Sequence, residues 1–274
     1  ISLGADPITA VKVACHNAAR YFLLNNRGAI APGYLADFAV VEDLKDFHVV
    51  TVYKRGKRVY HDGIVEDFPL PEIPEHLNKR AHDTFHLPVL SPADFANTRL
   101  RGVIGMVPGQ IITEDAGYAA GVDVSKDILK MAVVERHKNT RHIGIGYLKG
   151  YGLKSGAVAT SVAHDSHNII CVGTNDEDMA FAVNRIARNR GGIVVVENGQ
   201  VLAELPLEIA GIISGKPLRE VNTLLEDAKK AAHALGVGTD IDPFMTLSFM
   251  SLPVIPTLRL TTRGVVDVNT QQYV

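Results

Sequence analysis

Apolar residues near the start of the chain recur at the spacing of a helix. Asp6 and Pro7 are typical of a helix start, with Asp6 as the N-cap and Pro7 at the first helical position. From there to Ala18, apolar side chains three or four residues apart share one face, which predicts a helix over residues 7–25. Because one helix cannot bury its apolar face alone, we expect its packing partners upstream of Ile1.

Between Gly28 and Gly63 the pattern changes to short apolar runs bounded by turn residues. These runs predict strands at residues 38–41, 49–53 and 59–60. Residues 64–98 then contain prolines at positions 69, 71, 74, 88 and 92, which interrupt any periodicity. This segment is predicted to be a surface connector with one short helix near residues 75–81.

From residue 99 onward, strand and helix patterns are mixed without strict alternation, which favours an α+β class. Strands are predicted at residues 103–112, 128–136, 143–148, 157–163, 169–172, 192–197 and 201–205. Helices are predicted at residues 176–188 and 217–235, the second ending before Gly236. Asn198-Gly199 predicts a tight hairpin turn, and the apolar tail 244–268 is broken by prolines.

Composition indicates an ordinary globular chain, with 46% hydrophobic and 21% charged residues. A net charge of −2 gives no positive field that would attract nucleic acid or an anionic membrane. Each apolar stretch is interrupted well before the ~18 residues that a membrane-spanning helix needs. Cys15 and Cys171 form no close pair, so we expect a reduced, cytoplasmic setting in which both thiols are packed as small apolar groups.

The densest polar cluster is the run His164, Asp165, Ser166, His167 and Asn168. It lies between two apolar runs and is therefore predicted to be the tip that joins two strands. Its donors, acceptors and titratable groups suit proton transfer or the recognition of a ring with several nitrogens. The alternative is a turn whose side chains cap their own backbone, and the sequence leaves the two equally open.

Other motifs are weaker. The glycine run from Gly144 to Gly150 resembles a phosphate loop, but its third glycine is one residue late and no helix clearly follows. The acidic residues 176–178 are expected to stabilise a helix start, with Thr174 or Asn175 as the cap, and Lys229-Lys230 to face solvent. His16 is a candidate core histidine. There is no His-x-His or Cys-x-x-Cys sequence that would indicate a metal site.

Two groups of residues carry a family resemblance. Residues 6–11, 16–20 and 28–38 resemble the end of an amidohydrolase-superfamily barrel, above all in the run Gly-x-Ile-x-Pro-Gly-x-x-Ala-Asp from Gly28. Residues 161–170, 172–179 and 247–256 resemble the C-terminal domain of bacterial adenine deaminases. The resemblance implies the last helix of a (β/α)8 barrel and part of a small β-sandwich in residues 1–63, a connector at 64–98 and an α+β C-terminal domain at 99–274.

The resemblance also implies a reaction: hydrolysis of adenine to hypoxanthine and ammonia by hydroxide formed on a divalent metal, manganese or iron, in purine salvage and adenine catabolism. In this family the metal ligands lie on barrel strands, so the resemblance places them in an upstream half and assigns none to this chain. The chain is therefore expected to be a C-terminal half that is inactive alone.

The candidate substrate contacts are His164, Asp165, His167 and Asn168. Adenine is the expected small-molecule substrate. The enzyme is expected to be a homodimer, with neither nucleic acid nor a membrane as partner. Two alternatives stay open. The second region is an oligomerisation or stabilising domain that uses the apolar tail 244–260, or the chain belongs to an amidohydrolase for another cyclic amidine.

Overall fold

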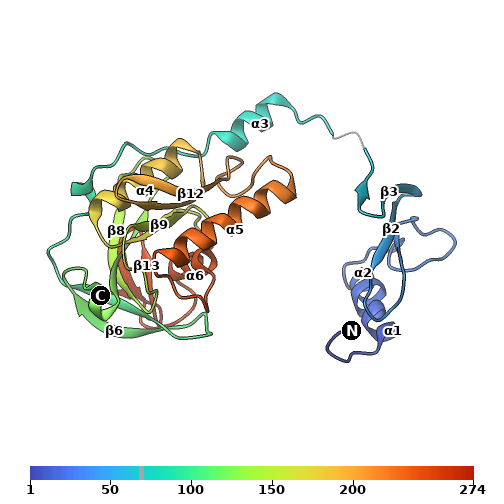
Figure 1. Ribbon diagram of the computed structural model, residues 1–274, viewed down its shortest axis with the longest axis horizontal. Helices are drawn as coiled ribbons and strands as arrows, with labels where there is room; N and C mark the ends of the chain where they lie inside the picture. The colour runs from blue at the N-terminus through green and yellow to red at the C-terminus, as the bar shows by residue number, and fades with distance from the viewer. Residues whose placement is uncertain (68–70) are drawn as a thin grey trace. The chain divides into compact units, whose positions relative to one another are not determined.

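The computed structural model describes residues 1–67 and 71–274. The chain divides into two compact units, Ile1–Glu72 and Ile73–Val274 (Figure 1). Most of the predicted connector falls within the described residues and includes a helix, α3, at Glu75–His82, which confirms the predicted short helix. The prediction that the whole segment lies on the surface is wrong, because Leu90 and Phe95 are buried in the core of the second unit. Pro69 of the connector lies outside the described residues. No helix in the described ranges has the length and apolar character needed to cross a membrane.

The first unit begins with a helical segment made of α1 (Pro7–Lys12), a π-helical turn (Val13–Asn17) and α2 (Ala18–Tyr21). An Asp6 carboxylate oxygen accepts the Thr9 N–H at 2.8 Å, which confirms the predicted cap. The helix ends at Tyr21, earlier than predicted, because the chain turns back closely on itself. A Cβ at Gly28 would lie 2.6 Å from Ala19 Cβ, so only glycine fits there.

A four-stranded antiparallel sheet completes this unit in the order β1-β2-β3-β4. Its strands are β1 (Phe38–Val41), β2 (Val49–Lys54), β3 (Lys57–His61) and β4 (Ile64–Val65). Asp37 fixes the β2–β3 turn, since its carboxylate accepts the Arg55 N–H at 2.6 Å and pairs with Lys54 at 3.2 Å. The expectation of buried side chains at His16 and Cys15 is wrong, because both are exposed on the helix.

The second unit is built on an eight-stranded sheet in the order β12-β11-β9-β10-β7-β8-β5-β6, in which only the β5–β8 pair is parallel. Its strands are β5 (Arg101–Met106), β6 (Thr113–Ala119), β7 (Ile128–Val134), β8 (Ile143–Lys149), β9 (Ala157–Thr160), β10 (Ile169–Gly173), β11 (Gly192–Glu197) and β12 (Gln200–Pro206). Short 3-10 turns lie at Pro92–Phe95 and Val124–Lys126. In the described parts of the chain the sheets are open and none closes into a barrel.

Helices cover both faces of this sheet (Figure 1). Alternation along β10 sends Ile169 into the core beneath α4 (Asp176–Arg188). The next residue, Ile170, enters the opposite core, beneath α5 (Leu218–Ala234) and α6 (Pro243–Met250). A three-stranded sheet of β13 (Leu258–Thr261), β14 (Gly264–Asp267) and β15 (Gln272–Tyr273) packs beside β8.

Predictions made from caps, turns and short-range periodicity agree best with the structure. The limits of α4 and β11 agree with the prediction, Asn175 caps α4 by accepting the Asp178 N–H at 2.7 Å, and Asn198-Gly199 forms the predicted turn. The strand predicted at 103–112 is wrong beyond Met106, where a loop leads into β6. β6 was missed because it is an edge strand with mostly polar, partly exposed residues and no apolar alternation.

The glycine run does not form a phosphate loop, which agrees with its weak match to that motif, because Gly144 and Gly146 lie within β8. A Cβ at Gly144 would lie 1.8 Å from the Thr261 carbonyl oxygen, so the glycines allow the β13–β14 hairpin to pack closely on β8. The apolar tail is mostly buried inside its own unit, including Leu247 and Leu260 at 0% exposure. It therefore offers little of the apolar surface on which the oligomerisation alternative relied.

Candidate functional site

The predicted polar tip, residues 164–168, joins β9 to β10, which are antiparallel neighbours in the centre of the sheet. The prediction that this run connects two strands is confirmed. Asp165 and Ser166 are exposed, whereas His164 and His167 are half-buried and Asn168 is buried. The polar groups of the tip therefore range from solvent-exposed at Asp165 to buried at Asn168.

The tip is docked against the end of α6. The His164 backbone N–H donates to the Ser248 carbonyl at 3.0 Å, and its ring lies 4.9 Å from the Phe249 ring, centroid to centroid. The rings of His164 and His167 are 6.3 Å apart at an angle of 67°. These contacts hold both imidazoles close together but out of direct hydrogen-bond contact with each other.

His167 has the most unusual surroundings. Its φ of +47° is in the left-handed region, and its N–H donates to the Ala163 carbonyl at 2.6 Å. Burial lowers the pKa of the imidazole, and the neighbouring His164 and Arg136 charges lower it further. His167 is therefore neutral at pH 7. Within the described residues, its Nδ1 and the Asn168 Oδ1 are buried without a hydrogen-bond partner. Such unpartnered buried atoms are rare in folded proteins and mark the inner side of the tip as incompletely satisfied.

Arg136 secures the tip, and the sequence did not single it out. Its guanidinium donates to the carbonyls of His167 at 2.5 Å, Thr84 at 2.7 Å and Ala210 at 3.0 Å. The same group stacks on the Phe85 ring at 4.3 Å. Burial lowers the pKa of Arg136 to about 10, which still leaves it charged at neutral pH. The only signal in the sequence was a cation at the end of an apolar strand.

A second polar contact supports the tip from the neighbouring strand connection. A ring nitrogen of His137, Nε2, lies 2.8 Å from the Ser166 carbonyl oxygen and donates to it in the matching tautomer. The tip is thus held at its backbone by two side chains that follow β7. Of its own side chains, the Ser166 hydroxyl accepts the Asn168 N–H at 3.4 Å, and Asp165 is exposed to solvent.

The described residues of the chain do not fit a metal ion. Within residues 1–67 and 71–274, no group of three or more His, Cys, Asp or Glu side chains is placed to hold one. The two imidazoles and the Asp165 carboxylate of the tip do not form such a group. What the tip can do is accept, donate and transfer protons at the edge of a polar ring.

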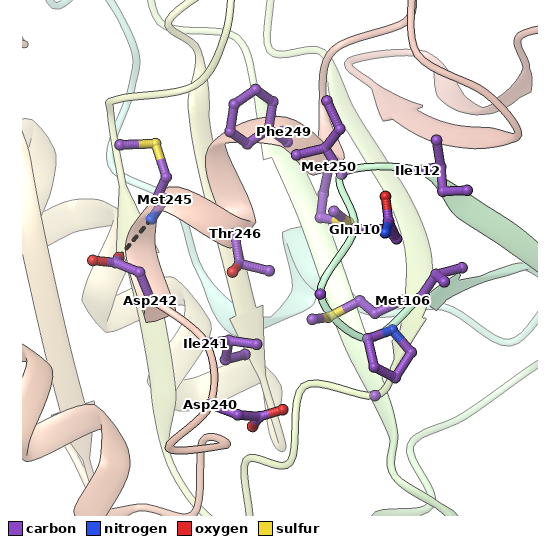
Figure 2. A pocket seen from close by; sticks show the side chains of 15 residues that line it. Met106, Gln110, Ile112, Asp240, Ile241, Asp242, Met245, Thr246, Phe249 and Met250 are labelled. Carbon is purple, nitrogen blue, oxygen red and sulfur yellow. Dashed lines mark hydrogen bonds between the residues drawn. The ribbon is translucent and has the colours of Figure 1, made fainter. Parts of the chain in front are cut away.

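A pocket of about 330 Å³ adjoins the same helix (Figure 2). One wall is α6 with the loop before it, and the other is the segment between β5 and β6. Phe249 belongs to both places, because it lines the pocket and contacts the His164 ring. The tip and the pocket therefore share one side chain of α6.

Comparisons with known proteins cover nearly the whole chain. The model of the adenine deaminase C-terminal domain matches residues 110–272, and that of the amidohydrolase family matches residues 2–59. An adenine deaminase of Nitratidesulfovibrio vulgaris strain Hildenborough is 45% identical over 100% of this chain and 48% of its own length. One of Dehalococcoides mccartyi strain 195 is 44% identical over 98% and 48%, and one of Geobacillus kaustophilus is 39% identical over 100% and 49%. The chain spans about half the length of these curated relatives.

Proposed function

The chain belongs to the adenine deaminase family, and we propose that it is the carboxyl-terminal half of an enzyme that hydrolyses adenine to hypoxanthine and ammonia. The observation that carries the proposal is the family match over residues 110–272, which includes the tip and α6. We extend the proposal to purine salvage and adenine catabolism in the cytoplasm, by a homodimer. Free thiols at Cys15 and Cys171 are compatible with a reducing compartment.

The amidohydrolase match over residues 2–59 supports a role for the first unit in the catalytic half. Residues 1–63 would supply the last helix of a (β/α)8 barrel and strands of a small β-sandwich, and residues 64–98 the connector. Residues 99–274 would then form the adenine deaminase C-terminal domain. The exposed apolar residues after α2, among them Phe22 at 70% and Leu23 at 78%, are consistent with packing against further polypeptide.

The amidohydrolase family suggests dependence on a divalent metal. Since the described residues of this chain do not fit one, the proposal places the metal, manganese or iron, in the other half of the enzyme. The part left to this chain is the binding and proton handling of the purine edge.

Each candidate residue has a role in that task. The neutral His167 imidazole and the Asn168 amide would pair with ring nitrogens, since both carry a buried polar atom without a partner. The exposed Asp165 carboxylate would accept from the amino group, and His164 would exchange a proton with the ring. A site that pairs with polar groups of its substrate rejects analogues that lack them, by factors of ~10⁴ or more.

The test joins the chain to the amino-terminal half of the Nitratidesulfovibrio adenine deaminase and measures ammonia release from adenine. We expect His164→Ala and His167→Asn each to lower kcat/KM at least tenfold, about 1.4 kcal/mol. Asparagine is used at His167 because it tolerates the left-handed backbone.

His142→Ala is the matched control, because this histidine is exposed in the loop before β8. The hydrogen bonds that it forms within the described residues use its own backbone, whose N–H donates to the Thr140 hydroxyl and whose carbonyl accepts the Glu135 N–H. Losses under threefold, about 0.7 kcal/mol, in both tip variants would leave the tip as a structural turn. A folded hybrid protein that released no ammonia would contradict the deaminase proposal itself.

A further inference from the structure

The pocket beside α6 has walls of unusual chemistry for a surface hollow. Its apolar lining includes three thioethers, from Met106, Met245 and Met250, together with the Phe249 ring. Methionine side chains are flexible and polarizable, and their thioethers make favourable contacts with aromatic rings. Its volume of about 330 Å³ is at the lower end of the range for small-molecule sites, enough for one compact ring system.

The polar groups in this lining are available for a ligand. Figure 2 shows Thr246 and Gln110 among the side chains that line the pocket, from α6 and from the β5–β6 segment. In the described parts of the chain, neither the Gln110 amide nor the Thr246 hydroxyl forms a hydrogen bond with another group, and the Asp240 carboxylate is also without a partner. Asp242 is different, because it caps α6 through Phe244 and Met245 and pairs with Lys229 at 3.0 Å.

Charge decides which ring compounds the pocket accepts. Its lining contains the carboxylates of Asp240 and Asp242 and no lysine, arginine or histidine. A phosphate group would meet the Asp240 carboxylate and no cationic side chain of the lining, so nucleotides are disfavoured. A free base carries no such charge. A glutamine amide has a donor and an acceptor side by side, which match the adjacent nitrogen groups at a purine edge.

We propose that this pocket, formed by residues 106–112 and 240–250, binds a neutral purine base, stacked between the methionines and Phe249 and held at its edge by Gln110 and Thr246. The choice of purine rests on the proposed function, whereas the preference for an uncharged ring rests on the lining alone. Because Phe249 also contacts His164, a ligand that moves the Phe249 ring would also change the surroundings of the His164 imidazole.

Methionine NMR tests the proposal on the chain as it stands. The chain contains five methionines, and three of them line the pocket. Met131 and Met179, both at 0% exposure in the core, serve as internal controls. In a sample labelled with ¹³C at the methionine methyl groups, adenine should shift the signals of Met106, Met245 and Met250 in a saturable manner and leave the other two unchanged. Adenosine monophosphate should cause no such shift at the same concentration.

Substitutions at the two polar residues test whether they bind the edge of the base. Gln110→Leu and Thr246→Val should each weaken adenine binding about fivefold, the effect of one neutral hydrogen bond. Gln200→Leu is the matched control, since this exposed glutamine lies on the β11–β12 hairpin. The proposal is overturned if adenine shifts no pocket methyl up to its solubility limit, or if the monophosphate binds as well. Ammonia release by the hybrid enzyme is a separate measurement, so failure of the pocket and failure of the deaminase proposal can be told apart.

Discussion

At the scale of single residues, one buried cation organises the tip. Arg136 is 2% exposed, and its guanidinium is the donor for carbonyls from three segments distant in the sequence, at Thr84, His167 and Ala210. A planar group with five N–H donors can serve three acceptors at fixed angles, which an ammonium cannot do. Position 136 is therefore expected to tolerate neither an apolar residue nor lysine.

The stability of Arg136→Met tests this directly. Removing the guanidinium leaves three carbonyls without their donor, and we expect a loss of about 3 kcal/mol in the free energy of unfolding. Urea unfolding followed by circular dichroism measures it. Arg263→Met, at an exposed arginine of the last hairpin, should change the same quantity by less than about 0.5 kcal/mol. Equal effects of the two variants would contradict the role assigned to Arg136.

His167 makes stability depend on pH. Its folded-state pKa lies below the ordinary 6.5, chiefly through burial, with His164, Arg136 and His137 adding to the effect and Asp165 opposing it. Below pH 6.5 the unfolded chain therefore binds a proton that the folded tip resists, and stability is lost as the pH falls. Compared with His167→Asn, the native chain should lose unfolding free energy between about pH 7 and pH 5. Parallel curves for the two proteins would show that His167 titrates normally.

At the scale of elements, the β13–β14 hairpin packs closely on β8 because β8 has glycines at the points of contact. Gly144 leaves room for the Thr261 carbonyl, and a Cβ at Gly146 would lie 2.5 Å from a Val265 methyl. The close approach brings the β13–β14 pair against the main sheet and buries Leu260 and Val265 in the shared core. The glycine run is thus a packing surface for another element.

Gly144→Ala should disrupt this packing. The added methyl would overlap the Thr261 carbonyl oxygen, which is backbone and can move only with its hairpin, so we expect a loss of about 3 kcal/mol in unfolding free energy. Gly121→Ala is the control, since a Cβ there meets nothing within 4 Å. Thermal unfolding and hydrogen exchange in residues 258–267 measure the effect. If residues 258–267 exchanged their amide hydrogens as slowly in Gly144→Ala as in the native chain, the close contact at Gly144 would not be needed to hold the hairpin.

At the scale of the whole molecule, the family suggests a metal that the described residues do not fit. We therefore expect the purified chain, after incubation with manganese or iron and desalting, to retain less than ~0.1 metal ion per chain, as weak sites release bound ions on dilution. Elemental analysis gives the ratio, and the hybrid enzyme is the positive control. One retained ion per chain, lost on mutation of His164 and His167, would move the metal site into this half.

Features that depend on neighbours along the chain could be predicted from the amino-acid order alone. Asp6 and Asn175 start helices because their side chains reach N–H groups three residues on, and Asn198-Gly199 turns because both residues accept positive φ. The placing of the polar run 164–168 at a tip followed for the same reason, since it lay between two apolar runs.

Contacts between residues distant in the sequence, in contrast, are visible in the folded chain alone. The edge strand β6 is held by its pairing with β5, and its own polar residues gave no period to detect. Arg136 gains its importance from carbonyls more than 30 positions away in the chain. The pocket exists because the β5–β6 segment and α6, separated by over 100 residues, form its opposite walls. Such contacts depend on the path of the backbone through the core, and no local spacing encodes that path.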